Sequence, residues 1–435
     1  RDAYQYVFRG LSKVAKDLNL TQQKFAMPSF LGQRKWTTPK EQADFEAYAF
    51  QDVIVLWELV YWILDLHRKF DVGLSVSLAD LAGKIFRKHH VTKEIEPTNH
   101  HVTMAALSSY HGGKTEKYVE GVTLIKDIHE YDITSAYPYA MSQIGNFSNY
   151  EIQPWKKTQS IQNNGVYQIS TDLQCTYRPL YNEDFQRVPV LTKQWVTGWE
   201  LNSALKYDCL KGLEICQGYV MISHNEKENG LKDYVETFFA RKQQADKEKN
   251  ATERLASKLF LNALYGKFIS KIQEEKDELE SWKGGVIFHP LIATLITGFV
   301  RAYVHDIEHV SQCFHTSTDS FITKHATLDS FFPGVKGLGT LKKEYSGDAL
   351  IIRPKVYVIF DSIDPDCHHK FDIDETKNVY CVYCQAKTLK SATHGFYGSV
   401  HMLLNMWKGG KTNYVVNRMV RLKEAMRRRD PDVLP

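Results

Sequence analysis

Helical and strand-rich stretches alternate in uneven blocks along this chain of 435 residues. A long amphipathic helix is predicted over Glu41–Phe70, because apolar side chains recur there at helical spacing. Further helices are predicted over Tyr234–Lys249, Thr252–Ile269 and Pro290–Val310. Residues 121–133 and most of the last hundred residues favour strands. Because no regular strand–helix–strand rhythm connects these blocks, the pattern predicts an α+β fold.

The composition is that of an ordinary folded protein. Hydrophobic residues make up 43% and charged residues 24%, which excludes a disordered chain, a coiled coil and a fibre. At ~150 residues per domain, the length predicts about three domains. The net charge is only +4, from 55 basic and 51 acidic residues, so nucleic-acid affinity must come from local basic patches.

Three simple features of the sequence indicate its cellular setting. They are the cysteine content, the hydropathy and the first residue. Seven cysteines, an odd number, favour reduced thiols and an intracellular location. No stretch offers the ~20 clean apolar residues expected of a membrane span. Arginine rather than methionine at position 1 indicates a piece of a longer chain.

The helix predicted from Thr252 carries polar and aromatic side chains on one face. Arg254, Lys258, Asn262 and Tyr265 follow one another at i, i+4, i+8 and i+11. Two cations on such a stripe suit the phosphates of a nucleoside triphosphate, while the amide and the ring would meet its sugar and base. The glycine after the tyrosine would let a backbone or a base pair approach closely. The alternative is a solvated helix face with one buried tyrosine.

Two aspartates occupy the ends of predicted strands. Asp132 ends the strand before Ile133, and Asp319 lies at the tip of a hairpin whose turn is Ser317–Ser320. If these strands pair, the carboxylates can hold two Mg²⁺ ions ~3.5–4 Å apart for a displacement at phosphorus. Tyr137 would underlie the sugar of a nucleotide and exclude a 2′-hydroxyl. The alternative for Asp132 is a turn-capping residue.

In order along the chain, these segments resemble the motifs of family B DNA polymerases, in particular the protein-primed branch of phages, adenoviruses and linear plasmids. Residues 132–138, DITSAYP, resemble D-x-x-S-L-Y-P; 258–266, KLFLNALYG, resemble K-x-x-x-N-S-x-Y-G; and 315–320, HTSTDS, resemble Y-x-D-T-D-S. Residues 110–113, YHGG, resemble Y-x-G-G; 355–357, KVY, resemble K-x-Y; and 48–52, YAFQD, resemble the third exonuclease motif, Y-x-x-x-D. Six motifs in the right order make a chance resemblance very improbable.

The resemblance implies a right-hand polymerase fold with a partial exonuclease domain. The implied segments are an exonuclease remnant at 1–85, palm at 86–150 and 289–362, an insertion of the protein-primed type at 151–226, fingers at 227–270, a short second insertion at 271–288, and the thumb with the C-terminal region at 363–435. The first two exonuclease motifs are expected to precede residue 1. Tyr48 and Asp52 are therefore expected to be structural, and no proofreading is expected.

The resemblance also implies an activity and a set of site residues. The chain would be a DNA-directed DNA polymerase that adds dNTPs to a primer 3′-hydroxyl with Mg²⁺, or Mn²⁺ in its place, in the replication of a virus or mobile element. Asp132, Asp319 and Lys258 would be catalytic, and Asp132, Ile133 and Asp319 would hold the metal. The nucleotide would contact Ile133, Ser135, Tyr137, Arg241, Arg254, Lys258, Asn262 and Tyr265. The DNA would contact Tyr110, Gly112, Gly113, Gly266, Ser320, Lys355 and Tyr357.

The implied partners are primer–template DNA, dNTPs and a terminal priming protein, with no membrane. The implied location is intracellular, in the cytoplasm, nucleoid or nucleus of a host.

Three residues depart from the motifs. Ser317 replaces the first Asp of D-T-D, whereas Ala136 and Ala263 are small changes that could loosen the nucleotide pocket. Since Asp132 and Asp319 are retained, we expect metal binding to be retained.

Two other functions stay open. An inactive, polymerase-like scaffold that binds nucleic acid is motivated by Ser317, and a primer-independent nucleotidyl transferase is motivated by the small second insertion.

Two further patterns lie near the C-terminus. A basic helix is predicted over Asn417–Arg429, where it would contact duplex phosphates as part of the thumb: Arg418, Arg421, Lys423, Arg427, Arg428 and Arg429. Cys367, His368 and His369, followed by Cys381 and Cys384, resemble a zinc-binding pattern. However, a strand is predicted over 378–385, and it would direct Cys381 and Cys384 to opposite faces. No zinc site is therefore expected there.

Overall fold

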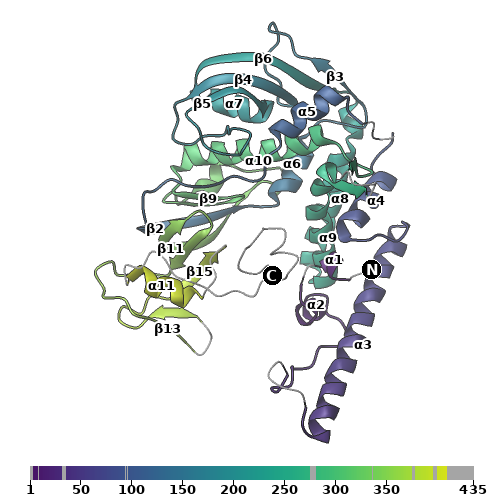
Figure 1. The fold of residues 1–435 in the computed structure, drawn as a ribbon, viewed down its shortest axis with the longest axis vertical. Helices are drawn as coiled ribbons and strands as arrows, with labels where there is room; N and C mark the ends of the chain where they lie inside the picture. The colour runs from purple at the N-terminus through teal and green to yellow at the C-terminus, as the bar shows by residue number, and fades with distance from the viewer. Residues whose placement is uncertain are drawn as a thin grey trace, which may run out of the picture. The chain divides into compact units, whose positions relative to one another are not determined.

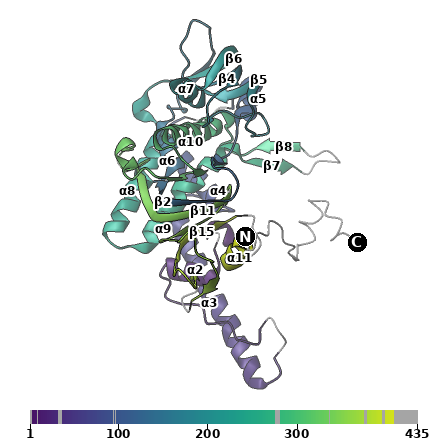
Figure 2. The same ribbon diagram turned by 90° about the vertical axis from the view of Figure 1, so that its left-hand side faces the viewer.

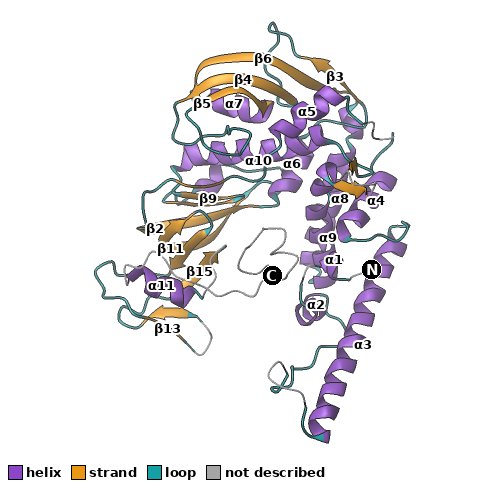
Figure 3. Ribbon diagram, in the orientation of Figure 1, coloured by secondary structure: helices purple, strands orange, loops and turns teal. Residues whose placement is uncertain are grey.

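The computed structural model describes residues 3–7, 9–31, 36–93, 95, 97–274, 281–335, 337–374, 378–394 and 399–408. These residues form helices and antiparallel sheets (Figure 3), so the predicted α+β class is confirmed. The chain divides into two compact units, each assembled from three stretches. The first comprises Arg1–Lys114, Ile133–Ser311 and Leu328–Lys342, and the second comprises Thr115–Asp132, Gln312–Thr327 and Lys343–Pro435.

The first unit contains most of the helices (Figure 1). They are α1 (Tyr4–Val7), α2 (Leu11–Asp17), α3 (Pro39–Lys69), α4 (Leu78–His89), α5 (His100–Ser109), α6 (Ala136–Gln143), α7 (Gly198–Lys206), α8 (Gly230–Lys247), α9 (Ala251–Ala263) and α10 (Pro290–Ser311). Short 3₁₀ helices cover η1 (Glu226–Glu228), η2 (Tyr265–Ile269) and η3 (Leu328–Phe331). Side-chain caps set several of the starts: Thr38 accepts from the Glu41 amide before α3, and Asn250 accepts from the Glu253 amide before α9.

α10 is the most buried helix of the first unit, and it packs against α5, α6 and α7. Its Gly298 permits the close approach to α7, because a Cβ added there would lie 2.3 Å from Thr197 Oγ1. Thr197 is itself the N-cap of α7 and forms a capping box with Glu200. A larger residue at 298 would therefore separate α10 from the start of α7.

The first unit also contains a four-stranded antiparallel sheet within the segment predicted as the first insertion. Its order is β3 (Tyr150–Pro154), β6 (Leu210–Ser223), β4 (Gly165–Leu173) and β5 (Val190–Thr197). A buried apolar core joins β4, β5 and β6 to α7, with Tyr167 and Leu201 fully covered. A separate hairpin of β7 (Lys271–Glu274) and β8 (Ser281–Gly284), visible in Figure 2, falls in the predicted second insertion.

The second unit is built on a seven-stranded sheet. Its order is β1 (Thr115–Lys117), β9 (His315–Ser317), β10 (Ser320–Thr323), β2 (Thr123–Ile133), β11 (Leu341–Arg353), β12 (Val356–Phe360) and β15 (Thr388–Thr393). Aliphatic residues of β2, β10, β11 and β12 form a core on one face, including Ile128, Ile322 and Ile359. A second cluster joins β12 to the hairpin of β13 (Phe371–Ile373) and β14 (Val379–Cys381) and to α11 (Val400–Lys408).

Three sequence-based expectations need correction or fall outside the described residues. The helix predicted over 252–269 ends at Ala263 and continues as η2. The strand predicted over 378–385 is wrong, because β14 ends at Cys381 and a turn follows. The basic segment 417–429 lies outside the described residues.

One described helix, α3, is long and apolar enough to cross a membrane by length and composition alone. The sequence, in which no stretch of ~20 uninterrupted apolar residues was found, did not predict that this helix meets the criterion. The helix carries exposed apolar side chains, among them Phe50, Val53 and Trp57. Because the core helix of a soluble protein meets the same criterion, the finding does not by itself indicate a membrane.

Candidate active site

Strand pairing in the second unit brings Asp132 and Asp319 together. Asp319 lies in the two-residue turn between β9 and β10, where Thr318 has a φ of 63° and the Asp319 amide donates to the Ser317 carbonyl at 2.8 Å. β10 then pairs antiparallel with β2, with Ser320 opposite Asp132. The hairpin and its position beside β2 are as the sequence pattern predicted. Their consequence is that two acidic side chains share one end of the same strand pair.

Burial and the neighbouring charge perturb the ionisation of these carboxylates. Burial, followed by repulsion from Asp319, raises the pKa of Asp132 to about 7. Burial also raises the pKa of Asp319. Two adjacent acids that are half-buried favour the uptake of positive charge, either as a proton or as a metal ion. Since their donors are carboxylate oxygens, the hard cation Mg²⁺ fits them.

A third acid, Glu130, lies on the same strand as Asp132 and was not predicted from the sequence. Glu130 is fully buried two residues before Asp132, on the same face of β2. It accepts a hydrogen bond from the Tyr357 hydroxyl at 2.6 Å and pairs with Lys390 Nζ at 2.7 Å. Tyr357, a predicted DNA contact, is thus held against β2. The spacing of Glu130 and Asp132 was the available signal.

The other predicted DNA contacts in this unit lie on two turns. Lys355 occupies the β11–β12 turn with a φ of 60°, and its amide donates to His315 Nε2 at 3.3 Å. Ser320 begins β10, and its hydroxyl donates to the Ser317 carbonyl at 3.4 Å. Their contact with DNA stays a prediction.

In the first unit, α9 presents the predicted cationic stripe. Arg254, Lys258 and Asn262 are exposed, whereas Ala256, Phe260 and Leu261 cover its opposite face. Three of the four side chains predicted to share a face therefore do so, whereas Tyr265 lies beyond the end of α9, in η2. Arg254 pairs with Asp246 of α8, and α8 packs along α9.

The neighbouring helix α8 carries two cations, Arg241 and Lys242, in different surroundings. Arg241 is directed to aromatic rings, with its guanidinium carbon 5.1 Å from the centre of Phe70. Lys242 faces α9 instead: its pKa is lowered, first by burial and then by repulsion from Arg254 and Lys258. Contact of Arg241 with the nucleotide stays a prediction, and the contact of Lys242 with the cationic face of α9 makes it a second candidate.

Two tyrosines of the first unit form a stacked pair. The ring centres of Tyr137 and Tyr265 lie 4.3 Å apart, with 16° between the ring planes. Tyr137 is placed by the turn at Ser135, whose φ of 54° directs the chain from β2 into α6. Gly266, beside the pair in η2, is exposed.

The segment at Tyr110, Gly112 and Gly113 is held by a buried arginine that the motifs did not reveal. Arg301 of α10 is fully buried and donates to the carbonyls of His111, at 2.6 Å, and Gly112, at 3.0 Å. Its Nε donates to Glu200 at 2.7 Å. Arg301 thus fixes the backbone of the predicted template-contacting loop. In the sequence it is visible only as a charge interrupting an apolar helix.

The residues of the predicted exonuclease motif have local partners. Lys24 Nζ lies 2.7 Å from Asp52 and 4.9 Å from the centre of the Tyr48 ring. These contacts agree with the structural role expected of both residues.

Comparison with known proteins identifies the family. Residues 11–286 match the family described as DNA polymerase type B, organellar and viral. Because the match covers more than half of the chain, the protein belongs to this family.

The relatives are longer than this chain. It is 24% identical over 377 residues to a DNA polymerase of Acidianus bottle-shaped virus, covering 79% of this chain and 54% of that protein. It is also 24% identical over 375 residues to a probable DNA polymerase of Ascobolus immersus, covering 73% of this chain and 29% of that protein.

Solved structures agree on the fold. The Phi29 DNA polymerase complexed with single-stranded DNA matches with a TM-score of 0.63 and 19% identity, over 82% of this chain and 66% of that one. The Phi29 ternary complex with primer–template DNA and incoming nucleotide matches with a TM-score of 0.61 and 19% identity, over 84% of this chain and 70% of that one. The expected polymerase fold is confirmed, and the domain boundaries stay predictions.

Proposed function

We propose that this chain is the polymerising part of a DNA-directed DNA polymerase, which extends a primer 3′-hydroxyl with dNTPs. The observation that carries the proposal is the pairing of β10 with β2, which sets Asp319 beside Asp132. Family membership and the cationic face of α9 support it. The substrates would be primer–template DNA and dNTPs.

The proposed reaction is a phosphoryl transfer. The 3′-hydroxyl oxygen forms a bond to the α-phosphorus, the bond from that phosphorus to the pyrophosphate oxygen breaks, and the hydroxyl proton passes to solvent. Asp132 and Asp319, with the Ile133 carbonyl, would hold Mg²⁺ or Mn²⁺. When bound, these ions would neutralise charge developing on the reacting phosphate.

The remaining residues have proposed roles in binding. Lys258, Arg254 and Lys242 would bind the β- and γ-phosphates. Ser135 and Asn262 would line the nucleotide site, and Tyr265 would test the nascent base pair. The proposed contacts with primer and template are Tyr110, Gly112, Gly113, Gly266, Ser320, Lys355 and Tyr357. The proposed setting is the replication of a virus or mobile element inside a host cell, with a terminal protein as an additional partner.

Extension of a labelled primer–template in Mg²⁺ and in Mn²⁺ tests this proposal. Template-directed products in either metal are expected. Retained binding of DNA and dNTP without turnover would favour the scaffold suggested by Ser317. Products in a lane without primer or without template would favour the nucleotidyl transferase instead.

Tyr137 is expected to discriminate against ribonucleotides. Its ring is fixed by stacking on Tyr265, so Tyr137→Ala should open space for a 2′-hydroxyl. The ratio of kcat/KM for dNTP to that for rNTP should fall about tenfold or more, the scale at which a pocket separates substrates differing by one small group. Single-nucleotide incorporation kinetics measure this ratio. Tyr137→Phe keeps the ring and is the matched control, and equal ratios in the Ala and Phe variants would contradict the role.

A further inference from the structure

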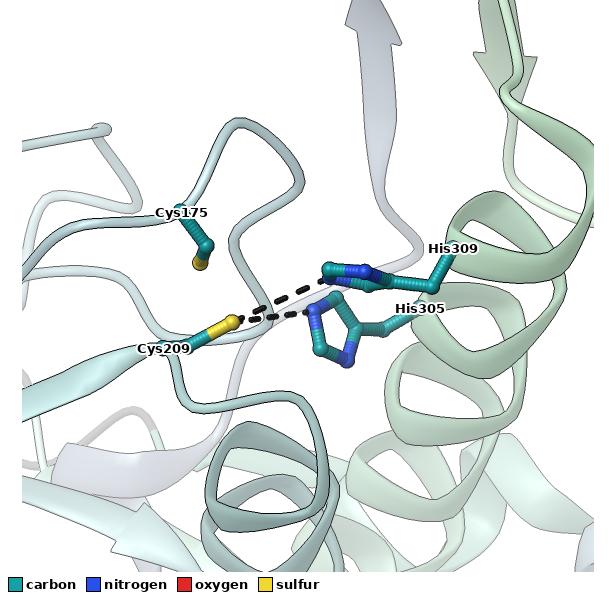
Figure 4. A group of neighbouring side chains, drawn as sticks. All are labelled: Cys175, Cys209, His305 and His309. Carbon is teal, nitrogen blue, oxygen red and sulfur yellow. Dashed lines mark hydrogen bonds between the residues drawn. The ribbon is translucent and has the colours of Figure 1, made fainter.

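Four metal-binding side chains converge in the first unit, away from the residues assigned above. Cys175 lies in the loop between β4 and β5, and Cys209 immediately precedes β6. His305 and His309 lie one turn apart on α10 and therefore share a face of that helix. Figure 4 shows the two imidazoles and the Cys209 thiol directed toward one another, with Cys175 beside them.

The spacing of these side chains suits a single tetrahedral ion. One ligand atom from each residue lies within 4.8 Å of all the others. Cys209 Sγ is 3.6 Å from His305 Nε2 and 3.8 Å from His309 Nε2. In a tetrahedral zinc site, bonds of about 2.3 Å to sulfur and 2.0–2.1 Å to nitrogen separate these atoms by about 3.5 Å. We propose that Cys175, Cys209, His305 and His309 bind one structural Zn²⁺.

Burial and charge favour this occupant. Cys209 and His305 are fully buried, and Cys175 and His309 are half-buried. Two thiolates would cancel the charge of Zn²⁺, so the loaded site would be neutral. Soft thiolate with imidazole is a ligand set that zinc prefers.

Neighbouring groups orient one histidine for binding. His305 Nδ1 lies 2.7 Å from Ser203 Oγ, and the Ser203 hydroxyl donates to Asp306 Oδ1 at 2.5 Å. An Nδ1–H donated to this hydroxyl leaves the Nε2 lone pair for the metal. The Tyr177 carbonyl lies 2.8 Å from Cys175 Sγ, from which it accepts a hydrogen bond, and 2.9 Å from His305 Nε2; metal binding would release the proton on each of these ligand atoms to solvent.

Four protein ligands leave no position for a substrate, so the role of the ion would be structural. It would fasten the β4–β5 loop and the start of β6 to the last turns of α10. These elements belong to the same unit but lie 96 residues apart between Cys209 and His305. A cross-link of this length would stabilise the predicted insertion against the central helix.

A second group in the other unit carries the same inference independently. Its ligands are Cys367, His369, Cys381 and Cys384. Cys381 Sγ lies 3.8 Å from Cys367 Sγ and 3.3 Å from His369 Nδ1. The same His369 nitrogen lies 3.8 Å from Cys384 Sγ. The turn after Cys381 brings Cys384 back to the same side, which a continuous strand could not do. We infer a second zinc ion here, which would join the β13–β14 hairpin to the preceding loop.

Metal analysis of the purified chain tests both sites. Two zinc ions per chain are expected after dialysis against metal-free buffer. Cys209→Ser and His309→Ala should each reduce the content to one, and Cys384→Ser should remove the other ion. Cys216→Ser and His224→Ala are the matched controls, because both residues are exposed and outside the two groups. They should retain two ions.

A second measurement uses the parent protein, so it does not depend on whether the variants fold. In the parent protein, a thiol reagent should release both ions in step with modification of the five ligand cysteines, whereas Cys216 should react without release. Replacement of zinc by Co²⁺ should give the visible absorption of a tetrahedral thiolate site. Absence of stoichiometric zinc, or a Cys175–Cys209 disulfide found by mass spectrometry, would overturn the first site. Unchanged zinc content in a soluble Cys384→Ser variant would overturn the second.

Discussion

Asp319→Asn is expected to lower primer extension about 10³-fold or more, to the background of the assay. The substitution preserves the size of the side chain and the hairpin turn but removes one of two adjacent negative charges at the β2–β10 pair. Without that charge, the site would lose its hold on Mg²⁺ and the electrostatic stabilisation of the reacting phosphate. Single-turnover extension of a labelled primer measures the loss, and Asp132→Asn should match it.

The control for this prediction lies on the same strand. Asp127 of β2 is exposed, and Asp127→Asn should extend primers at the parent rate. Binding of primer–template should be retained in Asp319→Asn, which separates lost chemistry from lost folding. Extension by Asp319→Asn within tenfold of the parent would show that Asp319 does not hold the catalytic metal.

Local pattern was sufficient for much of this site. The cations of α9 share a face because a helix repeats every 3.6 residues, and that period can be read from Arg254, Lys258 and Asn262 alone. The approach of Asp319 to Asp132 follows from a two-residue turn and a register that places Ser320 opposite Asp132. Both inferences depend on spacings of a few residues.

Contacts between residues far apart in the sequence could not be predicted from such short spacings. Glu200 and Arg301 are 101 residues apart, and nothing in either neighbourhood indicates the other. Of the four candidate ligands in the first unit, only the spacing of His305 and His309 was a visible signal. At Cys381 the error was of another kind: β-branched and aromatic neighbours favoured a continuous strand, whereas the chain turns after Cys381. Tertiary contacts decided these positions, and local propensity did not.

Arg301→Met is expected to lower the free energy of unfolding by about 3–5 kcal/mol. The guanidinium is fully buried and neutralises Glu200, whose side chain is 3% exposed, so its removal leaves an uncompensated carboxylate. Urea denaturation followed by fluorescence measures the change. Arg301→Met combined with Glu200→Gln should lower the free energy of unfolding by less than the sum of the single changes, because Glu200→Gln removes the buried charge.

Lys88→Met is the matched control. Its ion pair with Asp71 is exposed, so the loss of unfolding free energy should stay within about 1 kcal/mol. A cost for Arg301→Met as small as that control would show that the pair does not stabilise the fold.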